Sequence, residues 1–463
     1  MWMHPTASRT RGRRAAAWSL LLAAGIATGC DTSGILEVDL PGRVAEAALE
    51  DADLARVLVN GVIADAECAW NTYSAAASHH SDEWIPASGN LNMRNWGQRK
   101  IRDTDALLGK GTCDLNYGLY TPLHTARYQA GDVFERLGRF DAAKVPDTLK
   151  TRLQATVRAW GGFAVVALGE GFCEVTVDGG PILPKTEVLT LAEQWFTEAL
   201  TLATQIGNTD LQNMARVGRA RARIGLANWA GALVDASAVP AGYVKNVTRD
   251  TNRQRRWNYV FEYLVSTATG FNRHGSVSPA FRNLTVAADG AHTQSSGTAD
   301  PRVGAFTNNQ LAFDFSTIHW TIPKYTSRSS TLPLATHKEA QLYMAEAYAQ
   351  QGGAPNLVNA VGIIDARHAA AGLPAWTLGA TASQAEVLSH ILDERARELF
   401  AEGGHRLNDM IRYRGTSYDI PFKGEPGSVH PNGVDQTGDV YGTTTCFPLP
   451  AAERGGNPNV PTG

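Results

Sequence analysis

The segment His79-His80-Ser81-Asp82-Glu83-Trp84 gathers residue types that bind metals, transfer protons or contact ligands. A metal site needs ligands at helical or hairpin spacing, and hydrolysis of a glycosidic bond needs two carboxyl groups that face each other. The adjacent carboxylates Asp82 and Glu83 point in different directions in most backbone conformations. The segment therefore favours loop hydrogen bonding or ligand contact over catalysis or metal binding.

Residues 82–99 hold the chemistry that a sugar requires. Aromatic faces stack on the apolar faces of sugar rings, while carboxylate, amide and guanidinium groups bind hydroxyls in a mostly preformed cleft. This stretch is polar and without helical period, and two aromatic residues from the middle of the chain can complete it. The predicted ligand-binding residues are Asp82, Trp84, Arg94, Asn95, Trp96, Arg99, Trp320 and Tyr325. Each tryptophan is equally compatible with packing in the core or on a partner protein.

Motifs of common enzymes are missing from the sequence. It contains no Gly-x-Ser-x-Gly elbow, no Walker phosphate loop and no His-Glu-x-x-His helix. Gly169-Glu-Gly171 starts like a dinucleotide-binding loop, but Glu174 stands in the place of the third glycine. We therefore predict a protein that is not an enzyme, with no catalytic residue, no metal and no cofactor.

The N-terminus predicts export and lipidation. Four arginines between positions 9 and 14 precede a short apolar run, residues 15–26, and Ala27-Thr28-Gly29 ends it directly before Cys30. The run is too short for a permanent membrane span, so residues 1–29 are predicted to be a signal peptide. The small residues before Cys30 resemble a lipobox, which predicts a diacylated (palmitate-bearing) Cys30 and a tether over residues 30–45.

The charge of the chain excludes one class of partner. Its formal net charge is −3, and removal of the four N-terminal arginines leaves −7. A mildly acidic chain without a basic patch argues against nucleic acid as a ligand. Attachment to a membrane then depends on the acyl anchor, since the charge does not favour it.

Four further cysteines can form disulfides in an oxidising compartment: Cys68, Cys113, Cys173 and Cys446. Their spacings match no zinc motif. Four cysteines allow three pairings, and the sequence does not choose among them. We expect at least one disulfide.

Apolar spacing predicts a mostly α-helical body, residues 46–463. Apolar stripes at steps of three and four residues indicate paired helices over about 46–240 and 336–414, separated by a loop-rich region with short strands over about 241–335. Thr336/Glu339 and Ser383/Glu386 have the spacing of capping boxes. The tail, residues 415–463, is irregular. Such pairs suggest tetratricopeptide-like units that serve as a scaffold.

Three segments resemble the SusD/RagB family. Residues 391–412 are similar to its signature, residues 334–367 to its "AEAY … N-x-x-R" helix pair, and residues 446–459 to its C-terminal "PIP-x-x-E … NPN". An extra glycine (Gly403-Gly404) and Asp365 depart from the family pattern. Within the signature, Glu402 with Arg406 and Asp409 with Arg412 are spaced to pair on a helix face, a structural role that needs no chemistry.

The resemblance implies a SusD-like fold with long irregular loop insertions and few short strands. It also implies a lipoprotein on the outer face of the outer membrane that binds oligosaccharide or peptide and delivers it to a SusC-like, TonB-dependent transporter. Two alternatives remain open from the residues: a surface-anchored hydrolase, and a periplasmic helical-repeat scaffold of envelope assembly.

Overall fold

The computed structural model describes residues 46–114, 117–266, 270–377 and 381–461. The predicted signal peptide, Cys30 and tether lie outside these residues. The chain divides into two compact units, Met1–Leu49 and Glu50–Gly463. In the first unit only residues 46–49 are described, within a 3-10 helix. Everything below concerns the second unit.

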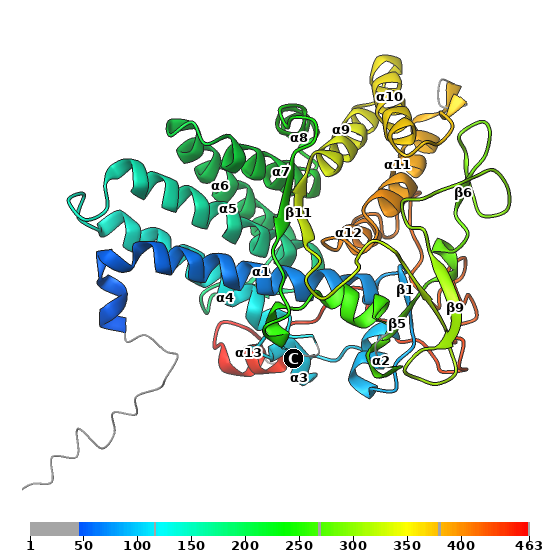
Figure 1. Cartoon of the computed structure of the whole chain (residues 1–463), viewed down its shortest axis with the longest axis horizontal. Coiled ribbons are helices and arrows are strands. Elements are labelled where there is room, and N and C mark those ends of the chain that lie inside the picture. The colour runs from blue at the N-terminus through cyan, green and yellow to red at the C-terminus, as the bar shows by residue number, and fades with distance from the viewer. Residues whose placement is uncertain (1–45, 115–116, 267–269, 378–380, 462–463) are drawn as a thin grey trace, which may run out of the picture. The chain divides into compact units, whose positions relative to one another are not determined.

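Helices form most of the second unit, as the apolar spacing predicted. Consecutive helices pack side by side, with α5 between α4 and α6, α7 against α6, and α10 against α9 (Figure 1). The mostly α-helical, tetratricopeptide-like prediction is confirmed. The long helices are α1 (Ala55–His80), α4 (Tyr120–Arg139), α5 (Asp147–Gly171), α6 (Lys185–Gln205), α7 (Thr209–Gly225), α8 (Trp229–Ser237), α9 (His337–Gln351), α10 (Ala354–Ala370), α11 (Gln384–Glu398) and α12 (His405–Arg412).

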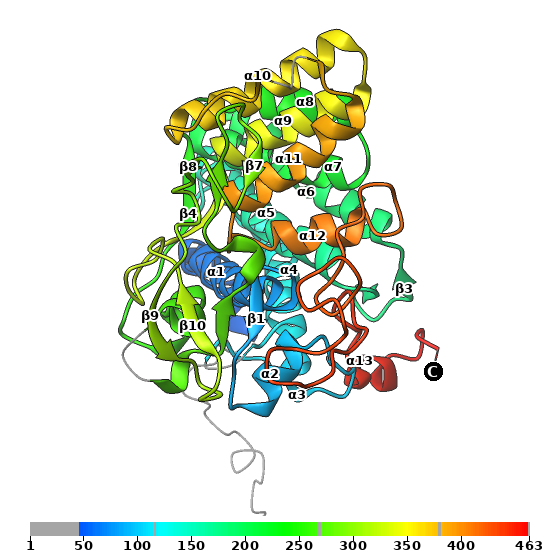
Figure 2. The same ribbon diagram turned by 90° about the vertical axis from the view of Figure 1, so that its right-hand side faces the viewer.

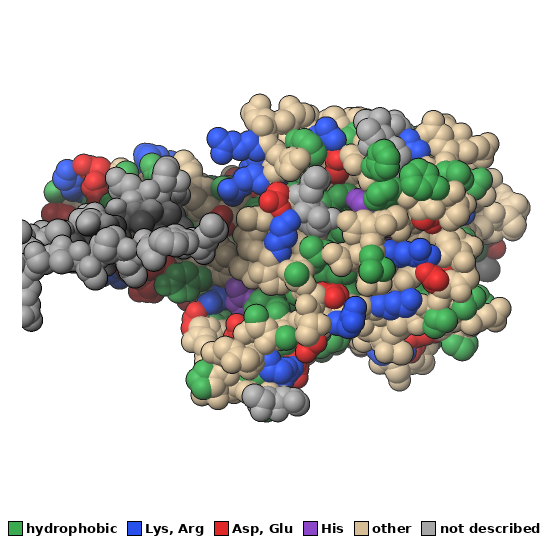
Figure 3. Space-filling view, turned by 90° about the horizontal axis from the view of Figure 1, so that it is seen from below, with side chains coloured by type: hydrophobic (Ala, Val, Ile, Leu, Met, Phe, Trp, Pro, Cys, Tyr) green, Lys and Arg blue, Asp and Glu red, His purple; other side chains and the backbone are tan. Residues whose placement is uncertain are grey.

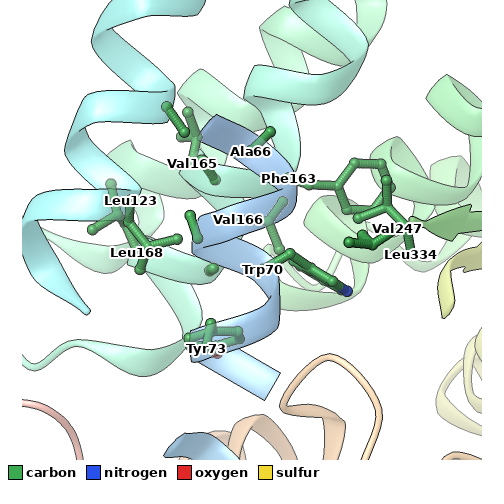
Figure 4. Close-up of a cluster of buried hydrophobic side chains, with 14 of the residues drawn as sticks. Ala66, Trp70, Tyr73, Leu123, Phe163, Val165, Val166, Leu168, Val247 and Leu334 are labelled. Atoms are coloured by element: carbon green, nitrogen blue, oxygen red, sulfur yellow. The ribbon is translucent and has the colours of Figure 1, made fainter. Parts of the chain in front are cut away.

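The main core lies around α1. Trp70 and Tyr73 of α1 are buried, and Trp70 meets Phe163 of α5 edge to face, with ring centroids 5.5 Å apart. Leu123 of α4 is also buried and packs on the opposite side of α1 from Trp70 (Figure 4). Burial of such side chains stabilises the fold by roughly 1.5–3 kcal/mol each, so α1 is held by apolar contacts on several sides.

The middle region is irregular with short strands, as predicted. All its strand pairs are antiparallel: β1 with β5, β4 with β11, β9 with β10, and β6 with β7 and β8. Another small pair, β2–β3, lies between α5 and α6. The strands are β1 (Trp84–Pro86), β2 (Val175–Thr176), β3 (Ile182–Leu183), β4 (Val244–Val247), β5 (Gly275–Val277), β6 (Thr285–Val286), β7 (His292–Thr293), β8 (Thr298–Ala299), β9 (Phe306–Leu311), β10 (Ile318–Thr321) and β11 (Leu332–Thr336).

Residues 82–99 contain more regular structure than the sequence suggested. After β1 comes the short helix α2 (Leu91–Gly97), whose N-cap Asn90 accepts a hydrogen bond from the Met93 N–H. The helix has two large buried apolar residues, Met93 and Trp96, and two positions are too few to show a helical period in the sequence. The remaining short helices are α3 (Ala106–Gly109) and α13 (Ala451–Gly456).

The two predicted capping boxes have different outcomes. Ser383 and Glu386 cap each other at the start of α11, which confirms that prediction. At α9, Thr336 accepts from the Glu339 N–H, but the Glu339 carboxylate accepts from Tyr343 Oη (2.9 Å) instead of capping back. The second box is therefore only half formed.

Gly403 and Gly404 form the turn between α11 and α12. Both have positive φ, 51° and 73°, where glycine is favoured. A Cβ on Gly403 would lie 2.6 Å from the Trp70 ring, and one on Gly404 would lie 2.7 Å from the Tyr73 ring. The extra glycine of the signature therefore lets this turn approach α1.

Two disulfides join distant parts of the chain. Cys68 pairs with Cys113, and Cys173 pairs with Cys446. The expectation of at least one disulfide is confirmed. Among the described helices, none combines the length and apolar character needed to cross a membrane.

Candidate functional site

Asp82 connects two helices. Its carboxylate accepts two hydrogen bonds from Arg406 of α12, Nε to Oδ1 at 2.7 Å and Nη2 to Oδ2 at 2.6 Å. The two side chains are only 8% and 12% exposed. Removing one partner of so buried a pair leaves an uncompensated charge. The structure thus shows Asp82 in the docking of α12 beside the end of α1.

Glu83 is buried next to this pair. Its Oε1 accepts a hydrogen bond from the backbone N–H of Ala401 at 2.8 Å. Burial raises the pKa of Glu83 to about 7, against the lowering effect of that hydrogen bond. The neighbouring carboxylates therefore act in packing, and neither reaches solvent as an acid–base pair would require.

Three of the four aromatic residues predicted to contact a ligand are buried in this structure. Trp84 and Trp96 are fully buried, and Tyr325 is 3% exposed with its hydroxyl donating to the Ala401 carbonyl. A buried ring has no free face on which a sugar can stack. These three residues belong to the core, which is the alternative that the sequence left open for each tryptophan.

Of the remaining predicted residues, Arg94, Asn95 and Trp320 are partly accessible and Arg99 is buried. Arg94 of α2 binds Asp439 at 2.6 Å, and Asn95 and Arg99 line a hollow of about 380 Å³ with residues 100–102 and 442–444. Arg99 is itself 2% exposed and bound to Glu425 at 2.9 Å. Trp320 is half-buried, with the guanidinium of Arg282 5.0 Å from its ring centroid. The structure therefore brings Asn95 and Arg99 together, but the Arg99 guanidinium already donates to Thr444, Lys423 and Glu425.

Exposed aromatic side chains occur instead on the loops beside β9 and β10. Phe271 and Phe315 are each 61% exposed, and Phe313 lies half-buried between them. The ring centroids of Phe271 and Phe313 are 5.4 Å apart and those of Phe313 and Phe315 are 6.0 Å apart, both edge to face. We call these three residues the aromatic cluster. Large apolar side chains that remain exposed together mark a site of interaction.

The loop that carries Phe313 and Phe315 is held by hydrogen bonds, and Phe271 packs against it from the segment before β5. Asp314 accepts from the backbone N–H groups of Ser316 and Thr317 and from the Thr317 hydroxyl. The Phe313 N–H donates to Arg273 O, and the Asp314 N–H donates to Ala87 O. The cluster is consequently preformed, which reduces the entropy lost when a ligand binds.

Exposed polar side chains lie on β9, which precedes Phe313 in the chain. Asn308, Asn309 and Gln310 at the end of β9 are exposed, and Arg273 donates to Gln310 Oε1 at 2.6 Å. Figure 2 shows β9 and β10 beside β1 and α2, and contacts of β5 with both β1 and β10 agree with that placement. Aromatic faces next to amide groups form a surface that suits a polyhydroxylated ring compound.

In the sequence, Phe271 and Phe313 are two of several aromatic residues scattered through the middle region. The Phe313-Asp314-Phe315 step was the available signal, because a turn-forming Asp between two aromatics places rings on a tight loop.

Figure 3 views the molecule from below Figure 1, and its hydrophobic side chains lie interspersed with charged ones.

A second hollow, of about 560 Å³, lies over α4. Its lining includes Tyr128, which is 56% exposed, and the ion pair of Arg127 with Asp178 at 2.6 Å. It offers one exposed ring where the aromatic cluster offers two. We therefore favour the cluster as the ligand site and keep Tyr128 as a comparison.

Comparison with known proteins confirms the resemblance to the SusD/RagB family. The model of the SusD family matches residues 334–460, the segment that contains all three resembling motifs. Among curated proteins none matches the chain. The matched residues include α9 to α12, where Arg395 binds both Glu346 (2.7 Å) and Asp409 (2.8 Å) in the buried interior.

Solved structures share the fold over nearly the whole chain. A SusD-like carbohydrate-binding protein from Bacteroides fragilis is 13% identical, with 89% of this chain and 100% of that chain covered and a TM-score of 0.63. A SusD homolog from Bacteroides thetaiotaomicron is 16% identical, with 89% and 97% covered and a TM-score of 0.62. Surface glycan-binding protein A from Bacteroides uniformis is 13% identical, with 87% and 98% covered and a TM-score of 0.60. The chain therefore has the SusD-like fold.

Proposed function

We propose that this protein binds glycans at the cell surface, holds them at the aromatic cluster and releases them unaltered. The observation that carries the proposal is the exposure of Phe271 and Phe315, 61% each, with Phe315 on a loop fixed by Asp314. An exposed aromatic ring gains free energy when a ligand covers it, because its apolar surface then leaves water. A sugar ring, with an apolar face and a hydroxyl rim, fits both these rings and the neighbouring amides.

Support for a glycan comes from the fold as well. Two proteins of the same fold are described as carbohydrate- or glycan-binding, and another as a laminarin-binding SusD-like protein. Asp82 is buried and paired with Arg406, and Glu83 is buried, which favours binding over hydrolysis.

Delivery to a transporter and attachment to the membrane complete the proposal. In keeping with the SusD/RagB resemblance, the bound glycan passes to a SusC-like, TonB-dependent barrel, and lipid on Cys30 holds the protein on the outer membrane, facing outward. Cys30→Ser should move the protein from the membrane fraction to the soluble fraction and abolish labelling by radioactive palmitate. Unchanged fractionation of this variant would contradict the anchor.

Affinity electrophoresis tests the binding site. Native gels containing laminarin, starch, xylan or galactomannan should retard the wild-type protein in at least one case. Replacing Phe271 and Phe315 together by alanine should weaken that retardation by about tenfold or more, since stacked aromatic anchors contribute upward of about 1 kcal/mol each. The reducing ends of the polysaccharide should not increase during the incubation.

Two matched variants control this experiment. Phe306→Ala removes an exposed phenylalanine of β9 outside the cluster, and Tyr128→Ala removes the exposed ring over α4. Both should bind like the wild type. Retardation lost in Tyr128→Ala but kept in the double variant would move the site to α4, and release of sugar would support the hydrolase.

A further inference from the structure

Four side chains of types that can bind metals converge where the small β6–β8 sheet meets the C-terminal helices. They are His292 of β7, His368 of α10, and His390 and Glu394 of α11, and one potential ligand atom from each lies within 4.8 Å of all the others. His390 and Glu394 are four residues apart, so they project from one face of α11. We call these residues the histidine cluster.

The hydrogen positions within the cluster follow from its surroundings. His368 Nδ1 lies 2.6 Å from the carbonyl oxygen of Pro374, and His292 Nδ1 lies 2.6 Å from Asp393 Oδ2. Because both oxygens can only accept, each Nδ1 carries the hydrogen. In a neutral imidazole the other nitrogen, Nε2, is then a bare acceptor.

The two Nε2 atoms face each other and a carboxylate. The two Nε2 atoms of His292 and His368 are 3.3 Å apart, and Glu394 Oε2 lies 2.9 Å from the first and 3.1 Å from the second. Three acceptors at such distances repel one another unless a positive charge lies among them. In a tetrahedral zinc site with bonds of about 2.0–2.1 Å, ligand atoms are separated by about 3.3 Å.

His390 offers a fourth potential ligand atom, within 4.8 Å of the other three. Its Nε2 is buried and has no hydrogen-bond partner. The ring is held between His292, with centroids 4.1 Å apart, and Trp376, with centroids 4.0 Å apart, both stacked. A buried nitrogen without a partner is costly, and coordination of a cation would satisfy it.

We propose that His292, His368, His390 and Glu394 bind a divalent transition metal of the zinc type. Four protein ligands leave no open position, so the role is structural, not catalytic. The outer contacts match those of such sites: a carbonyl and a carboxylate orient two of the imidazoles. The ion would fasten the β6–β8 sheet to α10 and α11.

The charges around the cluster suit one divalent ion. Arg302 pairs with Glu394 through Oε1, which leaves Oε2 turned toward the histidines. Arg302 is in turn bound by Asp300 at 2.7 Å. The four cysteines of the described chain that could compete as soft ligands are in disulfides. The available ligand atoms of the cluster are therefore imidazole nitrogens and a carboxylate oxygen.

Zinc binding by the full chain tests this proposal. After treatment with chelator and dialysis against Zn²⁺ at pH 7.5, mass spectrometry of the metal content should give one zinc per chain, and zinc should raise the Tm. His390→Gln keeps the size of the side chain roughly and breaks no hydrogen bond of Nε2, so it should fold. Its zinc affinity should fall by at least about tenfold, as for loss of a ligand or its orienting partner.

The matched control is His337→Gln, a histidine on α9 outside the cluster. It should bind zinc like the wild type, and zinc-edge X-ray absorption should show imidazole coordination in both. Absence of stoichiometric zinc from the wild type, or equal zinc affinity in His390→Gln, would overturn the proposal and leave two protonated histidines on Glu394 as the explanation.

Discussion

Two groups of aromatic side chains lie at opposite ends of one continuous path of ring contacts. Trp96 packs on Tyr117 (5.1 Å between centroids), Tyr117 on Tyr263 (5.5 Å), and Tyr263 on His274 (5.1 Å). His274 then meets Phe313 of the aromatic cluster at 5.5 Å. The inner end is fully buried, and the outer end is exposed.

The contrast teaches where each group acts. The inner rings contribute buried apolar area and so stability, whereas the outer rings keep their faces in water and have area left to give to a ligand. The path also explains why the exposed rings stay in place, because Phe313 rests on His274, which burial keeps neutral by lowering its pKa to about 4.

The largest expected effect is at the inner end. Trp96→Ala should lower the free energy of unfolding by about 3–5 kcal/mol, since it removes a fully buried indole from contact with Tyr117 and Phe447. Urea denaturation followed by circular dichroism measures this. Trp96→Phe should cost much less, because the indole N–H that it removes has no hydrogen-bond partner. Equal losses in both variants would show that the indole nitrogen matters more than the volume.

Glu83 gives the buried end a pH dependence that the exposed end lacks. Its pKa is about 7 in the folded state against 4.5 ordinarily, mainly through burial. The folded protein then binds more protons than the unfolded chain, so the contribution of Glu83 to stability falls as pH rises from about 4.5 to about 7. Glu83→Gln should raise the free energy of unfolding at pH 8 on the order of 2 kcal/mol and change it little at pH 4.5. Parallel pH profiles of variant and wild type would contradict this.

Phe313 is the link between the two ends, so its removal should affect both properties. Phe313→Ala should lower the free energy of unfolding by roughly 1–2 kcal/mol, as for a half-buried ring, and should also weaken glycan retardation. Phe315→Ala, at the exposed end, should change stability by less than about 0.5 kcal/mol while weakening retardation. If Phe315→Ala destabilised the protein as much as Phe313→Ala, the division between core and surface rings would fail.

Much of the scaffold was predictable because it depends on local spacing. The stripe through Leu123 and Ala130 is buried on α4, as steps of three and four require. Asp409 and Arg412 pair at 2.8 Å as their spacing predicted. Glu402 and Arg406 do not pair: Glu402 binds Lys324 and Lys338, while Arg406 binds Asp82. An opposite charge from another element was closer than the one along the helix.

The candidate site was less predictable, because contacts with other elements decide which of its residues are exposed. Asp82, Trp84 and Trp96 have the residue types of a sugar site, but α12 and the C-terminal segment cover them. Phe271 and Phe315 have no better signal in the sequence and remain uncovered. Spacing shows which side of an element a residue occupies, and it does not show what packs against that side.

The sequence by itself determined the helical class, the paired helices around an irregular middle, the SusD/RagB resemblance and the presence of disulfides. These features follow from local periodicity, from short motifs and from composition. Only the tertiary structure decided which rings are exposed, which cysteines pair, and that His292, His368, His390 and Glu394 meet. The physical reason is that exposure and proximity depend on contacts between residues up to hundreds of positions apart, as with Cys173 and Cys446, 273 residues apart.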